Sequence, residues 1–317
     1  MRALLAIALA CCASTGFAQS YPSGPMRIIA PYPPGGGTDV LARAIAQKLN
    51  ERFGHNVIVE NRPGANGTVG TGVAAKAAPD GHTMVVVAAA YAAGASLYRN
   101  LPYDPAKDLA PVTRLASGPL VLVVHPSLPV RSTKDFVALA KSRPGQINVG
   151  NSGTGSLPHL TAELLGSMSG IKLVHVPYKG PGLALIDVLS GQVPAYFMNV
   201  IGAMPLVKSN KLRALGVSSP ARSPIAPELP TIAEAGFPDF DMTNWYGLLV
   251  PSATPRDVVA KLQQEIARIM NLSESKELMS RSGMSVVAST PQQFSEFLSR
   301  ETVKYERVIK RAGVRQE

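Results

Sequence analysis

Apolar residues occur along this chain in two alternating arrangements, short continuous runs and helical stripes. Continuous runs at 28–30, 56–59 and 83–88 are typical of buried strands. Between them, residues 41–49 carry an apolar position every four residues, as an amphipathic helix does, and residues 68–78 are rich in small side chains that allow close packing. Strands that alternate with helices in this way predict an α/β fold, with a parallel sheet covered by helices on both faces.

A glycine loop follows the first predicted strand. Prolines end that strand, and Gly35, Gly36 and Gly37 then leave a loop with almost no side chain. Thr38 is expected to be the N-cap of the next helix, with Asp39 in its first turn. Such a loop brings a ligand to the unpaired N–H groups at the positive end of a helix, which favours a carboxylate or a phosphate. The plainer alternative is an ordinary tight strand-to-helix turn.

The same arrangement recurs in the second half of the chain. A strand predicted at 146–150 opens into a loop of Gly, Ser and Thr residues at 151–156, and a helix follows through His159 and Leu164. One such loop is ordinary, but two in different predicted domains indicate a ligand held between the domains. Ligands of open α/β sheets bind beyond the carboxyl ends of the strands, where both loops are expected.

The order of the predicted elements divides the chain into two domains. An apolar strand at 119–124 is expected to cross into the second domain, and a strand at 241–250, which contains the only tryptophan, Trp245, is expected to return. The helices after residue 254 are expected to pack on the first domain. The predicted domains are residues 19–122 with 243–317, and residues 123–242.

The N-terminus and the composition indicate an exported protein that folds without disulfides. Residues 1–18 have the pattern of a signal peptide, with Arg2, a short apolar segment and a small-residue cleavage site ending at Ala18. Cys11 and Cys12 suggest lipid attachment, but the residues before them fit that reaction poorly, so cleavage after Ala18 is expected. No apolar stretch reaches the length of about 18 residues that a membrane span needs.

The charge of the chain narrows the class of ligand. Hydrophobic residues make up 46% of the chain and charged residues 16%, which is typical of a compact folded protein, and the net charge is +10. A basic protein suits acidic small molecules, anionic surfaces or nucleic acid. The Lys and Arg residues are scattered and the chain is exported, so nucleic acid is not an expected partner.

Motifs of catalysis are incomplete. The five residues from Gly150 match the G-x-S-x-G nucleophile elbow except that Thr154 replaces the last glycine. The five histidines lack the spacing of metal ligands and have no cysteine partners in the exported chain, so no metal or cofactor is predicted. The alternative function is an exported α/β hydrolase in which Ser152 or Ser156 is the nucleophile and His159 the base.

An ordered series of motifs carries a family resemblance. The motifs are 31–39 (PYPPGGGTD), 59–64 (VENRPG), 79–81 (PDG), 151–156 (NSGTGS) with His159, 176–180 (VPYKG), 191–193 (GQV), 211–215 (KLRAL), 230–236 (PTIAEAG), and Trp245 with 251–255 (PSATP). With them, nearly the whole exported chain resembles the Bug-type periplasmic solute receptors, the binding components of tripartite tricarboxylate transporters. The family usually has an acidic residue directly after the GQV motif at 191–193, whereas this chain has Pro194.

The resemblance implies a fold, a ligand class and a site. The fold is the two-domain periplasmic-binding-protein (flytrap) fold, with a mainly parallel sheet flanked by helices in each domain and two crossover hinge segments. The ligand is a small organic acid or an acidic amino acid, and the partners are the membrane subunits of the transporter; the receptor is a periplasmic monomer, not an enzyme. The resemblance does not say which acid is bound, or whether the role is transport or signalling. The expected ligand-binding residues are Tyr32, Gly35, Gly36, Gly37, Thr38, Asp39, Ala90, Tyr91, Ser152, Thr154, Gly155, Ser156, His159, Tyr178, Lys179, Gly180 and Asn199.

Overall fold

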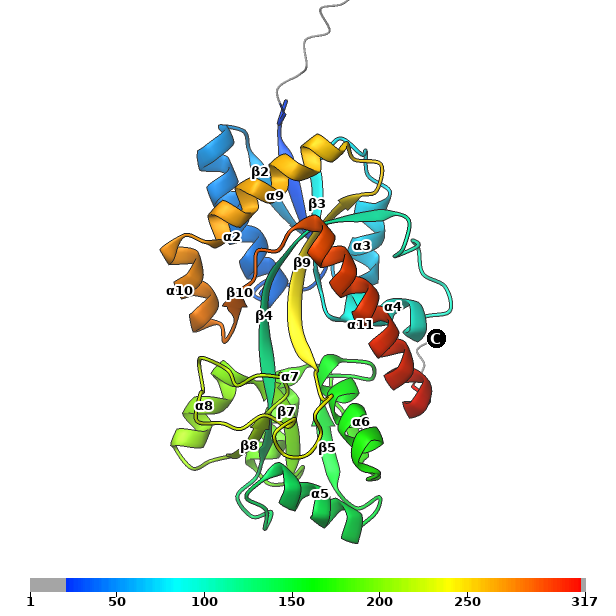
Figure 1. Cartoon of the computed structure of the whole chain (residues 1–317), viewed down its shortest axis with the longest axis vertical. Helices are drawn as coiled ribbons and strands as arrows, with labels where there is room; N and C mark the ends of the chain where they lie inside the picture. Colours follow the sequence, from blue (N-terminus) through cyan, green and yellow to red (C-terminus); the bar gives the residue numbers. More distant parts are fainter. Residues whose placement is uncertain (1–20, 315–317) are drawn as a thin grey trace, which may run out of the picture.

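The computed structural model describes residues 21–314. The predicted signal peptide, with Cys11 and Cys12, lies outside the described residues, as do residues 315–317. Within the described part the chain forms two lobes, one above the other in Figure 1, joined by two long central strands. This arrangement confirms the predicted two-domain α/β fold.

The first lobe is built from both ends of the chain. Its N-terminal elements are β1 (Met26–Ala30), α2 (Gly37–Phe53), β2 (Val57–Asn61), the 3-10 turn η1 (Ala65–Gly67), α3 (Thr68–Ala75), β3 (Thr83–Ala88) and α4 (Ala90–Leu97). Its C-terminal elements are β9 (Thr243–Pro251), α9 (Arg256–Met270), α10 (Ser273–Arg281), β10 (Ser285–Val286) and α11 (Pro291–Ala312).

The second lobe is built from the middle of the chain. Its elements are α5 (Thr133–Ser142), β5 (Asn148–Asn151), α6 (Leu157–Ser169), β6 (Val174–Pro177), α7 (Pro181–Leu189), β7 (Ala195–Asn199), α8 (Val200–Lys208) and β8 (Arg213–Val217). The strand β4 (Leu109–Val124) belongs to both lobes. The crossing strand predicted at 119–124 is the last part of β4, which begins ten residues earlier and is 16 residues long.

The strands follow the order β2-β1-β3-β9-β4-β7-β5-β6, and β8 and β10 also pair with β4. Within the first lobe β1, β2 and β3 are parallel, and within the second β5, β6 and β7 are parallel. β9 is antiparallel to both of its neighbours, β3 and β4. Each lobe therefore has the mainly parallel sheet that the alternation of strands and helices predicted.

The two long strands exchange partners at the lobe boundary. β4 pairs with β9 up to Pro119, opposite Thr243, and with β7 from Leu120 on, opposite Asn199. The crossing therefore follows Pro119 in one strand and precedes Thr243 in the other. The domain boundaries predicted at 122/123 and 242/243 fall close to this exchange and stay a prediction.

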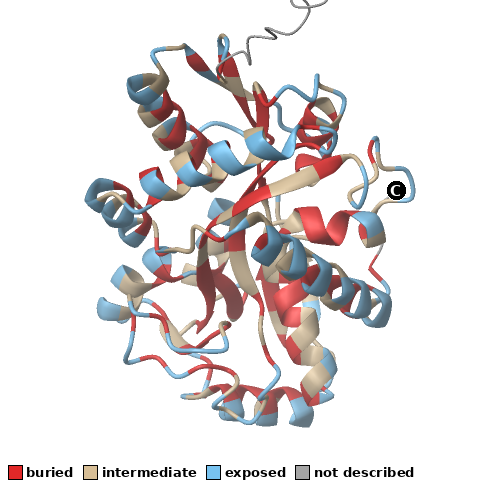
Figure 2. Ribbon diagram, turned by 45° about the horizontal axis from the view of Figure 1, so that its top comes forward, coloured by how far each residue is buried: buried red, intermediate tan, exposed pale blue. Residues whose placement is uncertain are grey.

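Helices cover the sheet, and the strands at its centre are largely buried (Figure 2). The predicted stripe of α2, formed by Leu41, Ile45 and Leu49, is fully buried, and it packs with Leu262 and Ile266 of α9 in one core cluster. Because each of these side chains is removed from water, each stabilises the fold by about 1.5–3 kcal/mol. This core fixes the start of α2, and hence the glycine loop before it.

The last helix contacts both lobes. As predicted, Thr290 caps α11, and the Gln293 side chain completes a capping box. The prediction that the C-terminal helices pack on the first domain was incomplete, because α11 lies against α4 in the first lobe and α6 in the second. Near its end, Arg311 Nη1 donates to Ser167 Oγ at 3.3 Å. An apolar stripe predicts that a helix is buried, but not which lobe covers it.

Candidate functional site

The directions of the strands bring both glycine loops to the lobe boundary. β1 and β3 run in the same direction as β4, which ends in the second lobe, so their carboxyl ends point toward that lobe. β5, β6 and β7 run against β4, so their carboxyl ends point toward the first lobe. The loops after β1 and β5 therefore lie at opposed sheet ends, where open α/β sheets bind ligands.

The first loop leads into α2 without a side-chain cap. The N-cap is Gly36, and Thr38 lies in the first turn, so the prediction that Thr38 caps the helix was wrong. Gly35 has a φ of 84°, which glycine adopts without strain. The Thr38 hydroxyl is buried and has no hydrogen-bond partner among the described residues. The first N–H groups of any helix have no partner within the helix, so this end of α2 has unused donors.

Asp39 holds the first loop in shape. Its carboxylate accepts hydrogen bonds from Gly35 N–H at 2.9 Å, from Asn61 Nδ2 at 2.9 Å and from Arg43 Nε at 3.0 Å. The Arg43 hydrogen bond is the main cause that lowers the pKa of Asp39 from 3.8 to about 2, against the opposing effect of burial. The carboxylate therefore faces its own loop, as a partner of the helix N-terminus does.

Two tyrosines pack against the first loop. The hydroxyl of Tyr246, on β9, lies where a Cβ on Gly37 would be, so any side chain at that position would displace Tyr246. Tyr246 also accepts a hydrogen bond from Asn244 Nδ2 at 3.1 Å. Tyr32 donates to the carbonyl of Asn66 at 2.8 Å, which ties the loop to the turn before α3. Tyr246, Asn244 and Asn61 were not predicted, because the order of the strands brings them to the loop.

The second loop is a compact turn before α6. Gly153 N–H donates to Asn151 Oδ1 at 3.0 Å, and Ser156 N–H donates to the carbonyl of Gly153 at 3.0 Å. Ser156 is the N-cap of α6 but makes no side-chain capping bond, and its hydroxyl is buried without a partner among the described residues. Ser152 is half-buried and Thr154 is exposed. Both loops thus end at an uncapped helix with one buried hydroxyl.

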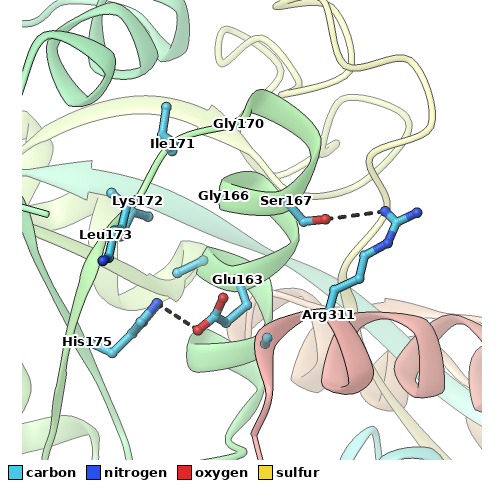
Figure 3. A pocket seen from close by; sticks show the side chains of 11 residues that line it. Glu163, Gly166, Ser167, Gly170, Ile171, Lys172, Leu173, His175 and Arg311 are labelled. Atoms are coloured by element: carbon cyan, nitrogen blue, oxygen red, sulfur yellow. Dashed lines mark hydrogen bonds and ion pairs between the residues drawn. The ribbon is translucent and has the colours of Figure 1, made fainter. Parts of the chain in front are cut away.

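A pocket of about 520 Å³ lies on the flank of the second lobe, between α6, the start of β6 and the end of α11 (Figure 3). Glu163, Lys172, His175 and Arg311 contribute charged or titratable groups to it. Its lining includes no residue of either glycine loop among the described residues. This pocket, where α6 of the second lobe meets α11 of the first, is therefore distinct from the two glycine loops.

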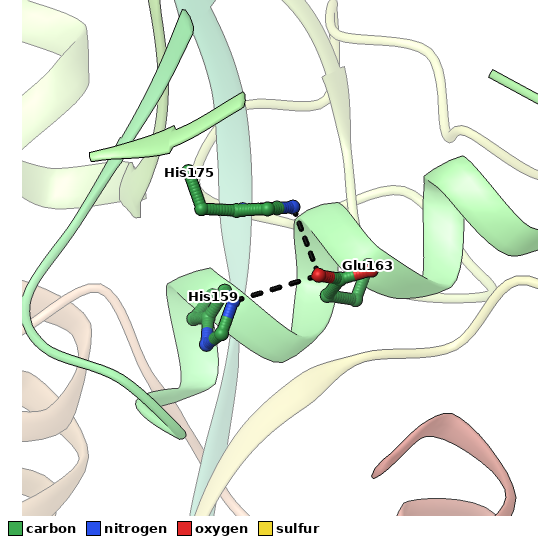
Figure 4. Close-up of side chains that lie close together, drawn as sticks. All are labelled: His159, Glu163 and His175. Atoms are coloured by element: carbon green, nitrogen blue, oxygen red, sulfur yellow. Dashed lines mark ion pairs between the residues drawn. The ribbon is translucent and has the colours of Figure 1, made fainter. Parts of the chain in front are cut away.

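His159, Glu163 and His175 form a cluster beside the second loop (Figure 4). Glu163 Oε1 lies 3.0 Å from His175 Nε2 and 3.6 Å from His159 Nε2. The other nitrogen of His159, Nδ1, accepts a hydrogen bond from Gly155 N–H at 2.9 Å. Burial raises the pKa of Glu163, but the two imidazoles outweigh it and lower this pKa from 4.5 to about 2.

The sequence did not indicate this cluster. Its ligand-type atoms lie within 4.8 Å of one another, a combination typical of metal sites, although the histidine spacing predicted none. A metal-bound imidazole normally donates its other N–H to an acceptor. Here Nδ1 of His159 faces a donor, Gly155 N–H, and Nδ1 of His175 has no partner among the described residues. The geometry therefore fits two histidines that interact with the Glu163 carboxylate through Nε2 better than it fits a metal site.

The remaining predicted residues lie at strand ends with differing roles. Tyr178 donates to Asp187 Oδ2 at 2.6 Å. The pKa of Tyr178 is raised to about 12, mainly because the hydroxyl is removed from water and also because it donates to the Asp187 carboxylate. Lys179 is exposed and has no ion pair among the described residues, and Gly180 is the N-cap of α7 with a φ of 123°. Asn199 is exposed at the N-cap of α8. These ends all belong to strands that point toward the first lobe.

The small residues at 88–91 predict a loop at the carboxyl end of β3, but the structure has a helix there. Ala90 begins α4, so Ala90 and Tyr91 are helical rather than part of a loop. Tyr91 is buried, stacks on Tyr103 and donates to the carbonyl of Pro105 at 2.9 Å. Small residues such as Ala88–Ala90 are typical of loops and helices alike, which explains the wrong prediction.

Two opposed lobes with a glycine loop at each facing sheet end define the class of two-lobed solute-binding proteins. A family profile described as "Tripartite tricarboxylate transporter family receptor" matches residues 41–314. The chain belongs to this family, as the ordered motifs predicted.

Relatives of known sequence or structure align with nearly the whole chain. Protein BugT of Bordetella pertussis is 36% identical over 311 residues, which cover 98% of this chain and 95% of that protein. The solved structure "R. palustris Rpa4515 with adipate" has a TM-score of 0.81 at 33% identity, over 93% of this chain and 100% of that one. The structure "MatC (Rpa3494) from Rhodopseudomonas palustris with bound malate" has a TM-score of 0.77 at 30% identity, over 91% and 100%. Within residues 21–314, none of the helices combines the length and hydrophobicity that crossing a membrane requires.

Proposed function

We propose that this protein is a periplasmic receptor that captures a small carboxylate-bearing molecule between its lobes and delivers it to the membrane subunits of a tripartite transporter. The family supports this proposal, as do the two similar structures that hold adipate and malate. Both of those ligands are dicarboxylates. The exported, monomeric state and the domains 19–122 with 243–317 and 123–242 are parts of the same proposal.

One observation carries the proposal. Each of the two facing loops ends at a helix N-terminus without a side-chain cap, and each holds a buried hydroxyl that has no hydrogen-bond partner within residues 21–314: Thr38 Oγ1 in one and Ser156 Oγ in the other. A buried polar group without a hydrogen bond costs free energy, so a native site of this kind calls for an explanation. A carboxylate between the loops would accept from these hydroxyls and from the helix N–H groups.

The energetics suit reversible capture. A hydrogen bond to a charged group contributes about 1.5–3 kcal/mol, so a few of them reach micromolar affinity after the cost of ordering the ligand. A ligand that touches both loops binds the closed arrangement of the lobes more tightly than the open one, and so it shifts the population toward closure. The closed receptor is the form that membrane subunits would recognise.

The geometry gives less support to a hydrolase. A serine nucleophile needs a base within hydrogen-bond reach. His159, the base of that alternative, directs Nδ1 to Gly155 N–H and Nε2 to Glu163, and it has no hydrogen bond to Ser152 or Ser156 among the described residues. Binding without turnover is therefore the function that the arrangement favours.

Thermal unfolding of residues 19–317 with a panel of carboxylates tests the proposal. A ligand at 100 times its Kd adds about 2.7 kcal/mol to the free energy of unfolding. Adipate, malate, glutamate and an aromatic acid are suitable first probes, with ester hydrolysis measured in parallel. We expect at least one carboxylate to raise the Tm without turnover. Turnover that Ser152→Ala or Ser156→Ala abolishes would support the hydrolase instead.

Two variants locate the site. Thr38→Val and Ser156→Ala each remove a hydroxyl that has no partner in the described part of the chain, so the unliganded Tm should stay unchanged or rise slightly, while the ligand-induced shift should fall. The double variant Thr154→Val with Ser156→Ala should abolish the shift. Ser142→Ala, on α5, is the matched control and should keep it. A large drop of the unliganded Tm in the first two variants would mean that the loops are structural instead.

A further inference from the structure

The hydrogen bond from Gly155 N–H fixes the protonation pattern of His159. A ring nitrogen that accepts a hydrogen bond carries a lone pair, so the proton of the neutral imidazole is on the other nitrogen, Nε2. His159 is 5% exposed, so water does not replace this backbone donor. The second loop therefore depends on one tautomer of one side chain.

Glu163 faces the nitrogen that bears this proton. Its Oε1 lies 3.6 Å from His159 Nε2, one helical turn along α6, and 3.0 Å from His175 Nε2. A carboxylate beside Nε2 favours a proton there over a lone pair, because a lone pair would face a negative charge. The side chain of Glu163 is 22% exposed, so solvent screens this interaction only in part.

We propose that Glu163 is a positioning residue for the second glycine loop. It keeps the proton of His159 on Nε2, which leaves Nδ1 free to accept from Gly155 N–H and holds the loop in the shape that presents the N-terminus of α6. Gly155 itself adopts a φ of 75°, so its N–H direction is set by the loop and not by a regular helix. The effect on ligand binding rests on the proposed function, whereas the effect on the tautomer does not.

The competing interpretation of the same three side chains is a metal site. Coordination through Nε2 of His159 would move its proton to Nδ1, where Gly155 N–H already points. Metal binding would then break the hydrogen bond that shapes the loop. The two interpretations therefore predict opposite tautomers, and the tautomer can be measured.

Nitrogen NMR of ¹⁵N-histidine-labelled protein tests the proposal at neutral pH. In the unchanged protein His159 should show a protonated Nε2, an unprotonated Nδ1 and a coupling to the Gly155 amide. Glu163→Leu should increase the population of the other tautomer and shift the Gly155 amide resonance. Glu163→Gln keeps an oxygen acceptor and should restore both signals. His175→Gln, which removes the other partner of Glu163, should leave the His159 tautomer in place.

The ligand titration and a zinc titration complete the test. For a carboxylate that binds the unchanged protein, Glu163→Leu should raise Kd by up to about tenfold, the effect of one misaligned hydrogen bond, and Glu163→Gln should restore it. A proton on Nδ1 in the unchanged protein, or loss of the Nε2 proton on adding stoichiometric Zn²⁺, would overturn the proposal. If the NMR results are as expected but no carboxylate binds, the proposed function fails and the positioning role stands.

Discussion

The indole N–H of Trp245 donates a hydrogen bond to the carboxylate of Glu301, with Nε1 2.9 Å from Oε2, and joins β9 to α11. Lys304 on the same helix pairs with Glu301 and lies 3.6 Å from Asp241, the residue that precedes β9 by two positions. Burial raises the pKa of Glu301, and Lys304 opposes this shift. A hydrogen bond between two buried side chains, flanked by the partly exposed Lys304 and Asp241, thus anchors the returning strand at the lobe boundary.

Removing the indole should be costly. Trp245→Phe leaves a Glu301 oxygen without its donor and a gap in the core, so the free energy of unfolding in urea should fall by about 2–4 kcal/mol. Glu301→Gln keeps an acceptor and should cost less. Because the folded-state pKa of Glu301 is raised above 4.5, the unchanged protein should lose stability relative to Glu301→Gln as the pH rises above 4.5. Equal losses in both variants at every pH would contradict this view.

Asp39 should make the fold sensitive to acid. Its pKa is lowered from 3.8 to about 2 in the folded state, so its stabilising effect is complete above pH 3.8 and is lost as the pH falls toward 2. Asp39→Asn should therefore lower the free energy of unfolding at pH 7 by about 1–2 kcal/mol and flatten its decrease below pH 4. Urea titrations at several pH values measure both effects. An unchanged slope below pH 4 would show that Asp39 is not the sensitive group.

Two adjacent glycines should respond differently to a methyl group. A Cβ on Gly37 would overlap the Tyr246 hydroxyl, whereas a Cβ on Gly36 would lie 3.4 Å from the carbonyl of Pro33, an ordinary contact. Gly37→Ala should displace the first loop and abolish the ligand-induced Tm shift. Gly36→Ala, at a φ of −74°, should keep most of that shift. The same loss in both variants would mean that backbone freedom, not the contact with Tyr246, is what the loop requires.

Lys179 should contribute charge to ligand binding. It is exposed after β6, at a strand end that points toward the first lobe, and no carboxylate pairs with it among the described residues. Lys179→Gln should weaken binding of a dicarboxylate more than that of a monocarboxylate, and high salt should reduce the difference. Lys141→Gln, on α5 at the far end of the second lobe, is the matched control (Figure 1). Equal affinities in both variants would place the ligand away from β6.

Local patterns predicted the fold and the loops well. The runs before Gly35 and Ser152, and the stripe of Leu41, Ile45 and Leu49, are properties of neighbouring residues, so strand, loop and helix could all be identified from them. Thr38 was wrongly predicted as the cap because the glycine before the helix serves equally well at that position. Such patterns do not locate the end of a helix to within one residue.

Contacts between distant segments could not be predicted in this way. Tyr246 reaches Gly37 because β9 lies next to β3, which lies next to β1. His175 reaches Glu163 because β6 pairs with β5, the strand before α6. No feature of either sequence segment contains this information, since it depends on the order in which the strands pair.

The shared strand β4 has a consequence for how this protein unfolds. One continuous strand pairs with β9 up to Pro119 and with β7 from Leu120 on. If either lobe unfolds, β4 loses its pairing there, and the other lobe is built on the same strand. The two halves should therefore denature in a single cooperative transition, and neither should survive as an isolated fragment.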